Sequence, residues 1–437
     1  MISSIVIANP VIGQTFHLNA QIMGFIIQAH LLGMILSLIP SGKIGNRYGH
    51  IKIFAAGCLI FGISSLLCGI ALNGEMVVFF RFIQGIGDGM MVASSIVLLT
   101  KTYGRGSRGR SLGFFLFSGY SGYITGMTIG TILIENTGWK SIFFIAFPFT
   151  ILAGLAAFRL FKNFKSPDET NTDKFDIIGL LVFSPSIMLL VLGLSDLTSP
   201  YSAFILIPGL TGLVLFGLWE NHFENPLINL SLFTNNRLFK YSIAADILYY
   251  ISIGSITFIL SIYLQNEMLI SSFSAGFILL PAFLTQAVFS PFAGHISDRI
   301  EPKFVTAAGL ALIIITLIYY SGIREGTDII TISSFLALSG IGFALFSSPN
   351  KNAIMSSVNE DNYGEASGIA NTFEQTGNII SISIATSAFT LMLGTSEITS
   401  ELFLEFTKSM KIIFEFSILI CILNIIVCLL RGNVNTK

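Results

Sequence analysis

The segment GKIGNRYGHIK, residues 42–52, recurs in altered form as GHISDRIEPK, residues 294–303. In both copies a glycine is followed, after three residues, by Asn or Asp and then Arg. Each copy lies between two long apolar runs, at the same position within its half of the chain. A parallel repeat of this kind predicts two homologous helical bundles.

The composition places this protein in a lipid bilayer. Of 437 residues, 53% are hydrophobic and only 11% are charged, whereas a soluble domain carries about a quarter charged residues. Apolar runs of about 20 residues, long enough to cross about 30 Å of hydrocarbon as helix, recur throughout. We expect full spans at 21–40, 53–71, 76–100, 111–134, 141–161, 177–194, 201–219, 241–264, 273–293, 304–321, 328–348, 368–392 and 409–430.

The basic residues set the expected topology. If the first helix runs outward from the cytoplasm, eighteen of the 23 Lys and Arg residues fall in inside segments, four fall outside, and Arg81 lies within a span. This positive-inside bias predicts a multi-pass protein of the plasma membrane with a cytoplasmic C-terminus. Residues 1–16 are apolar but too short for a span, so we expect a truncated first helix.

The longest inside connections, at 162–176 and 220–240, bracket two of the spans. The predicted fold class is therefore an all-α polytopic membrane protein of two six-helix bundles with a two-helix central insert. We expect an N-terminal bundle at 1–161, a linker with two extra spans at 162–240, and a C-terminal bundle at 241–437.

Several short motifs follow one another along the chain: RFIQGIG (81–87), GWKSIFFIAFP (138–148), NPLINLSLF (225–233), IYLQ (262–265) and AGFILLP (275–281). With residues 42–52, they resemble the major facilitator superfamily, specifically its fourteen-span drug/proton antiporter branch of multidrug and tetracycline efflux pumps. The resemblance covers nearly the whole chain. It implies alternating access around a midplane cavity, and proton-coupled efflux of small lipophilic or cationic compounds.

Two signatures of that family are altered here. The inside-loop signature has a carboxylate where this chain has Asn46, so we expect the first inside loop to be the weaker gate. The alternative is an ordinary basic turn that anchors the topology. The expected gating residues are Gly42, Asn46, Arg47 and Gly49 in the first loop, and Asp298 and Arg299 in the second.

Span 5 carries Gly122, Gly126 and Gly130 at intervals of four, which predicts a close helix seam. In the family signature, a proline and a glycine stand where this chain has Met127 and Thr131. Because the resemblance ties that signature to antiport, its loss favours uniport as an alternative.

Span 4 carries Arg81, Gln84 and Asp88 at i, i+3 and i+7, on one helical face. A charge in hydrocarbon is by default a functional site. Arg81 could instead be an anchor that snorkels to the interface. Asp88 is interpreted either as a proton or substrate group or as the partner of a basic residue. Gly85 and Gly89 predict the close approach of a neighbouring helix.

Span 13 carries a polar stripe that must face protein or a water-filled cavity. Glu374 could alternatively mark a cytoplasmic helix end. In span 9, Asp246 either pairs with Lys240 or faces the cavity. His30 in span 2 is either structural or a proton relay. The stripe consists of Asn371, Glu374, Gln375, Asn378 and Ser381.

No catalytic triad, metal-ligand cluster or basic nucleic-acid patch is visible, so we expect no enzyme activity, no cofactor and no nucleic-acid partner. The expected partners are a small-molecule substrate, protons and the lipid bilayer, bound by a monomer. Two alternatives stay open: a uniporter or importer of a small metabolite, and a transport-dead membrane sensor or scaffold.

Overall fold

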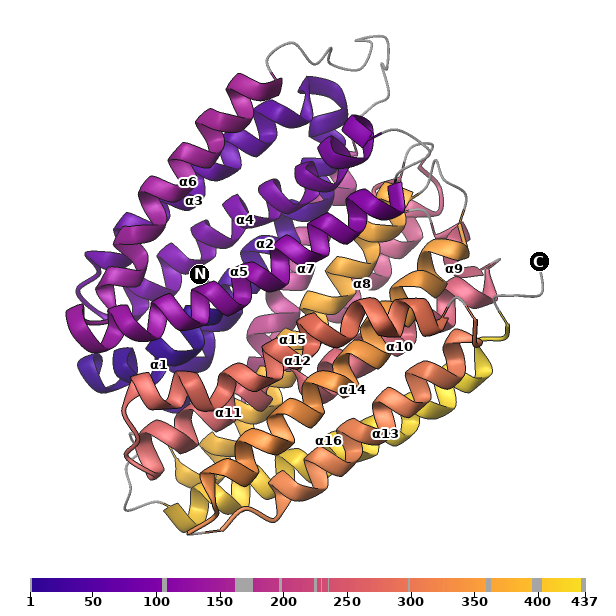
Figure 1. Ribbon diagram of the computed structural model, residues 1–437. Helices are drawn as coiled ribbons and strands as arrows, with labels where there is room; N and C mark the ends of the chain where they lie inside the picture. Colours follow the sequence, from indigo (N-terminus) through magenta and orange to yellow (C-terminus); the bar gives the residue numbers. More distant parts are fainter. Residues whose placement is uncertain are drawn as a thin grey trace. The chain divides into compact units, whose positions relative to one another are not determined.

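The computed structural model describes residues 2–103, 108–161, 176–195, 199–223, 226–228, 230–234, 236–297, 299–324, 326–358, 363–394 and 403–433. Every regular element within those ranges is helical, which confirms the predicted all-α fold class (Figure 1). The elements are α1 (Ile2–Phe16), α2 (Ala20–Tyr48), α3 (His50–Gly69), α4 (Gly74–Tyr103), α5 (Arg108–Thr137), α6 (Lys140–Phe161), α7 (Ile177–Ser195), α8 (Ser202–Glu220), α9 (Ser231–Thr234), α10 (Arg237–Ile253), α11 (Ile256–Ile262), η2 (Tyr263–Glu267), α12 (Ser272–Ser297), α13 (Pro302–Ser321), α14 (Ile329–Ser356), α15 (Tyr363–Leu393) and α16 (Phe403–Leu430).

In the described ranges, twelve segments are long and apolar enough to cross a membrane. They match twelve of the thirteen expected spans. The exception is 111–134, which lies in α5. That helix is 30 residues long, but its glycines, serines and threonines lower its mean hydropathy. Helix α1 has 15 residues, fewer than the 17–25 or so of a full span.

By its internal contacts the chain divides into two compact units, which we treat separately. The α4 unit comprises Ile22–Gly119 and Thr137–Leu230, and therefore includes the two insert helices α7 and α8. The α14 unit comprises Met1–Gln21, Tyr120–Asn136 and Ser231–Lys437. Helix α1 and the second half of α5 thus group with the C-terminal helices.

Within the α4 unit, α3 packs against α4 and α6, and α7 packs against α8. Helices α2 and α4 touch backbone to backbone. A Cβ added to Gly85 would lie 1.9 Å from the carbonyl oxygen of His30, and one added to Gly33 would lie 2.1 Å from that of Phe82. A Cβ on Gly89 would lie 2.1 Å from the Ser37 hydroxyl. The close approach predicted from Gly85 and Gly89 is confirmed.

Within the α14 unit, α14 packs against α10, α12 and α13, while α16 packs against α10, α13 and α15. The span expected at 241–264 lies within the candidate span Arg237–Glu267, and a break between α10 and α11 interrupts its helix. At this break the backbone N–H of Ser255 donates to the hydroxyl of Ser381 on α15, at 3.0 Å. A side chain from a neighbouring helix therefore satisfies a backbone group that the broken helix leaves without an intrahelical partner.

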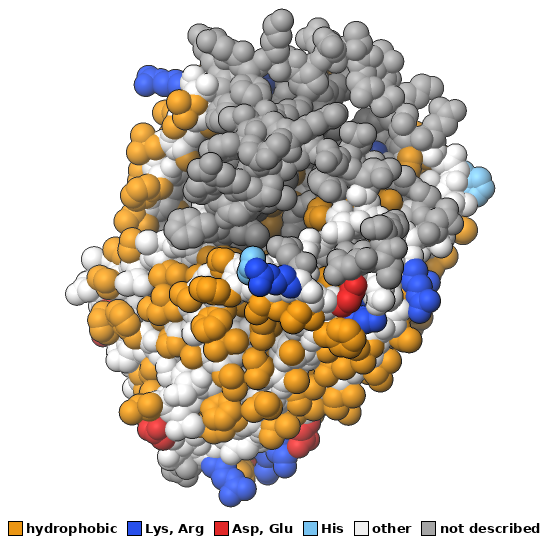
Figure 2. Space-filling model, turned by 45° about the vertical axis from the view of Figure 1, so that its right-hand side comes forward, with side chains coloured by type: hydrophobic (Ala, Val, Ile, Leu, Met, Phe, Trp, Pro, Cys, Tyr) orange, Lys and Arg blue, Asp and Glu red, His pale blue; other side chains and the backbone are white. Residues whose placement is uncertain are grey.

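Large apolar side chains cover much of the described surface, as Figure 2 shows for one face. Phe204 on α8 is 77% exposed and Phe149 on α6 is 66% exposed. Such surfaces are stable against lipid tails and unstable in water, so these helix faces fit a bilayer.

The contact between α2 and α4 generates a prediction. Gly85→Val should lower the free energy of unfolding by about 1–3 kcal/mol or more, because the new side chain must displace the backbone of His30. The matched control is Gly122→Val on α5, where a Cβ meets nothing within 4 Å. Denaturation of the purified protein in detergent measures both variants. Equal stability of the two would contradict the observed packing.

Candidate functional site

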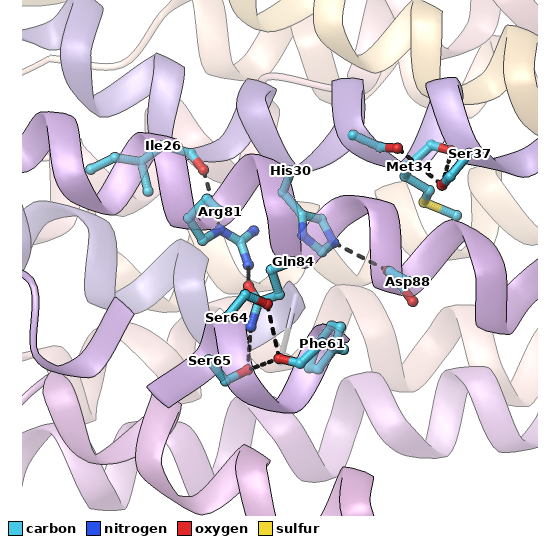
Figure 3. Close-up of polar contacts among 11 residues, drawn as sticks. Ile26, His30, Met34, Ser37, Phe61, Ser64, Ser65, Arg81, Gln84 and Asp88 are labelled. Atoms are coloured by element: carbon cyan, nitrogen blue, oxygen red, sulfur yellow. Dashed lines mark hydrogen bonds and ion pairs between the residues drawn. The ribbon is translucent and has the colours of Figure 1, made fainter. Parts of the chain in front are cut away.

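The polar face of α4 lies inside the α4 unit, turned toward α2 and α3 (Figure 3). Arg81 and Gln84 are fully buried, and the side chain of Asp88 is 14% exposed. The face predicted from the sequence is therefore present. The structure also shows the hydrogen-bond partners of this face, which include residues of α2 and α3.

Arg81 and Gln84 tie three helices together. The Nε of Arg81 donates to the carbonyl oxygen of Ile26 on α2 at 3.3 Å, and its Nη1 donates to the amide oxygen of Gln84. Gln84 in turn donates to the hydroxyl of Ser65 on α3 at 2.5 Å, and Ser65 donates to the carbonyl oxygen of Phe61 at 2.8 Å. The interpretation of Arg81 as a snorkelling anchor is wrong, because its guanidinium is held by buried acceptors.

Asp88 pairs with His30. The Nε2 of His30 lies 3.1 Å from Oδ2 of Asp88, and the His30 side chain is only 1% exposed. The Nδ1 of His30 has no hydrogen-bond partner in the described structure, and its ring packs at 83° to the ring of Phe61, with centroids 6.3 Å apart. A proton on Nε2 is therefore the tautomer that suits an ionised Asp88. The sequence allows Asp88 to be either a proton or substrate group or the partner of a basic residue, and the structure shows the second arrangement, with His30 as the partner.

A second polar cluster lies in the α14 unit around Asp246. The amide of Asn350 on α14 donates to Oδ1 of Asp246 at 3.1 Å, and the guanidinium of Arg431 donates to the Asn350 amide oxygen at 2.9 Å. Arg431 also donates to the hydroxyl of Thr306 at 3.4 Å. All four side chains are buried. The expected pairing of Asp246 with Lys240 is not seen; its hydrogen bond is to Asn350.

Glu374, on α15, forms an ion pair with Lys351 on α14, with Nζ 3.2 Å from Oε2. Asp246 lies near enough to both groups for electrostatic interaction. Two further residues of the polar stripe face protein. Ser381 bonds to Ser255, and Asn378 packs on Gly254, where a Cβ would lie 2.7 Å from its amide oxygen.

Asn371 is half-buried on the same helix. No hydrogen bond of its side chain links it to the ion pair in the described structure.

The structure describes only some residues of the two expected gating loops. Gly49 has φ +98°, a left-handed conformation that favours glycine, and it precedes α3. A Cβ added to Gly42 would meet nothing within 4 Å, and the backbone of Asn46 and Arg47 continues α2. Arg299 is exposed. The side chains of Asn46 and Arg47 and the whole of Asp298 lie outside the described residues.

The expected seam in α5 is present at two of its three glycines. The hydroxyl of Ser4 donates to the carbonyl oxygen of Gly126 at 2.7 Å. A Cβ on Gly130 would lie 2.7 Å from the Ser4 side chain, whereas one on Gly122 would meet nothing. Helix α1 therefore packs against the second half of α5.

Sequence reasoning missed several members of these clusters. Ser65 and Thr306 are ordinary polar residues in apolar runs, and Asn350 follows the expected span 328–348 in a polar segment, so none of the three carries a pattern of its own. Lys351 and Arg431 are two of the eighteen basic residues that the sequence assigns to inside segments, but Lys351 lies within α14 and Arg431 is buried. The available signal was a lysine three residues beyond the expected span 328–348, together with a glutamate inside the expected span 368–392. Within the described ranges, no group of three His, Cys, Asp or Glu residues could hold a metal ion.

The network around Gln84 predicts unequal effects for two neighbouring serines. Ser65→Ala should cost about 1–3 kcal/mol of stability, because it leaves the buried Gln84 amide without an acceptor. Ser64→Ala is the matched control, since Ser64 donates only to carbonyl groups of its own helix. Denaturation of both variants in detergent tests this, and an equal loss would show that Gln84 does not depend on Ser65.

Comparisons with known proteins agree with this architecture. The sequence pattern of the Major Facilitator Superfamily matches residues 1–404. The chain is 27% identical over 408 residues to the riboflavin transporter RibZ of Clostridioides difficile, covering 92% of this chain and 87% of that protein. It is also 27% identical over 390 residues to the tetracenomycin C resistance and export protein of Streptomyces glaucescens, covering 87% and 71%.

A solved structure shows the same fold. A mutant of the nucleoside transporter NupG aligns with a TM-score of 0.66 over 98% of this chain and 95% of that chain, at 13% identity. Because the family pattern spans most of the sequence, this multi-pass membrane protein belongs to the Major Facilitator Superfamily of transporters.

Proposed function

We propose that this transporter exports small lipophilic or cationic compounds in exchange for protons, as a member of the fourteen-span drug/proton antiporter branch. The observation that carries the proposal is the pair formed by His30 and Asp88, held between two candidate membrane spans. Ionisable side chains within membrane spans are energetically unfavourable, so an acid and a histidine there favour a functional role.

The geometry of the α4 unit gives protonation of Asp88 a structural consequence. Ionised Asp88 accepts a charge-assisted hydrogen bond from His30, and protonation weakens that bond. Because Gly85 holds α4 against the backbone of His30 itself, a change in the pair acts directly on the contact between α2 and α4. The Arg81 network is buried and hydrogen-bonded, so it supports the pair without exchanging protons with water.

The cluster in the α14 unit supports a role in substrate binding. The hydroxyls of Tyr249 and Tyr250 are buried and have no hydrogen-bond partner in the described structure. They belong to α10, which also carries Asp246, and Tyr249 stacks on Phe346 with ring centroids 3.9 Å apart. Aromatic rings beside carboxyl groups suit a substrate that is planar, cationic or both.

The names of the relatives support a second candidate function. One is named as an exporter of tetracenomycin C and one as a riboflavin transporter. The riboflavin transporter matches a larger share of both chains, which favours transport of a small metabolite as the second candidate. The altered span 5, with Met127 and Thr131, favours uniport over exchange for protons.

Proton flux in vesicles tests the proposal. Purified protein is reconstituted with a pH-sensitive dye inside, and riboflavin, tetracenomycin C or the lipophilic cation tetraphenylphosphonium is added outside. We expect at least one compound to drive proton movement in the wild type. Asp88→Asn should reduce this coupled flux by about tenfold or more, a loss typical of removing a proton-transfer group. Glu374→Gln should weaken substrate-driven flux by breaking the ion pair with Lys351.

The control variant is Glu415→Gln. Glu415 also pairs with a lysine, Lys411, but both side chains are more than half exposed, so this variant should transport like the wild type. Uptake of a compound without proton movement would indicate uniport instead of exchange for protons. Binding without transport of any compound would favour the sensor or scaffold.

A further inference from the structure

The turn between α11 and α12 has an unusual backbone. Residues Tyr263–Glu267 form a π-helical turn, η2, closed by the N–H of Met268 donating to the carbonyl oxygen of Tyr263 at 3.0 Å. Two residues after the turn, Leu269 has φ +53°, in the left-handed region that a leucine rarely adopts. π-Turns and left-handed non-glycine residues concentrate at functional sites.

Glu267, the last residue of the turn, is buried without a partner. The residue is 9% exposed, and neither carboxyl oxygen has a hydrogen-bond donor in the described structure. No Lys, Arg or His among the described residues lies within ion-pair distance of it. An ionised carboxylate in such a place has lost its water without gaining a cation, which is strongly unfavourable.

The three helices α1, α11 and α12 beside the turn supply no compensating charge close to Glu267. Helix α11 has no charged residue, and α1 carries none between Ile2 and Phe16. The titratable side chain of α12 is His295 in its last turn, roughly 35 Å from the start of the helix at 1.5 Å per residue. Tyr263 of the turn itself is the ionisable neighbour that interacts with Glu267, and its hydroxyl points to the carbonyl oxygen of Arg324.

We propose that Glu267 is a proton-binding site: its carboxyl group holds a proton in this conformation and releases it only when the group reaches water. This site is separate from the pair of His30 and Asp88, and nothing in the proposed function requires it. It gives the α14 unit a proton site of its own.

A proton is the favoured occupant because two nearby side chains that could offer oxygen ligands, Gln265 and Ser261, already use their oxygen atoms in hydrogen bonds. The amide oxygen of Gln265 accepts from Ser272 at 2.8 Å, and the amide nitrogen of Gln265 donates to Ser261 at 3.0 Å. The Ser261 hydroxyl itself donates to the carbonyl oxygen of Val6 at 2.8 Å. A metal ion bound through oxygen needs about six ligands, whereas a proton needs only the carboxyl group.

Stability as a function of pH is the first test, and it needs no substrate. If the folded protein holds the proton and the unfolded chain releases it, raising the pH destabilises the wild type. Glu267→Gln mimics the protonated acid and cannot ionise. Its melting temperature should therefore match that of the wild type at acid pH and exceed it increasingly as the pH rises. Glu415→Gln should follow the wild type throughout.

Chemical labelling is the second test. Dicyclohexylcarbodiimide is apolar and reacts with protonated carboxyl groups: the carboxyl O–H adds across a C=N bond, and the product rearranges to a stable N-acylurea. Mass spectrometry should find this adduct on Glu267 and not on the exposed Glu415. Above the titration point, the labelled fraction should fall about tenfold for each unit of pH, as the protonated fraction does.

Parallel pH profiles of the wild type and Glu267→Gln would overturn the proposal. Labelling that Na⁺ or Ca²⁺ blocks at constant pH would also overturn it, since a metal ion would then be the occupant. Neither result bears on coupled flux through Asp88, so this inference and the proposed function fail independently.

Discussion

Hydrocarbon offers no hydrogen bonds, so every polar group that a helix carries into the membrane needs a partner from the protein. In the α4 unit this requirement is met by one helix face. Arg81 and Gln84 reach a carbonyl group of α2 and a hydroxyl group of α3, and Asp88 reaches His30. These bonds fix which faces of α2, α3 and α4 meet, and the apolar packing follows from them.

The same requirement explains the close helix contacts. Small residues allow the backbones of α2 and α4 to touch, and only at that separation can the Arg81 guanidinium reach the carbonyl oxygen of Ile26. In the α14 unit, Asn350 donates a hydrogen bond to Asp246 and accepts one from Arg431. Where a carboxyl group lacks any such partner, as at Glu267, a proton is the simplest remaining way to remove its charge.

Helical periodicity and hydropathy predict much of this fold, because they depend on residues close in sequence. They place the twelve candidate spans of the described ranges, put Arg81, Gln84 and Asp88 on one face, and identify Gly85 as a contact. They do not predict partners on other helices: Ser65 sits in an apolar run like many serines. The break at Ser255 cannot be predicted from nearby residues either, since it depends on Ser381, 126 residues away.

We propose that substrate binding and protonation are linked through Asp88. Isothermal titration of the transported compound, in two buffers with different ionisation enthalpies, counts the protons exchanged on binding. The account predicts that the apparent enthalpy of the wild type changes with the buffer, and that Asp88→Asn abolishes this change. Identical enthalpies for the wild type in both buffers would show that binding moves no proton, and would contradict the account.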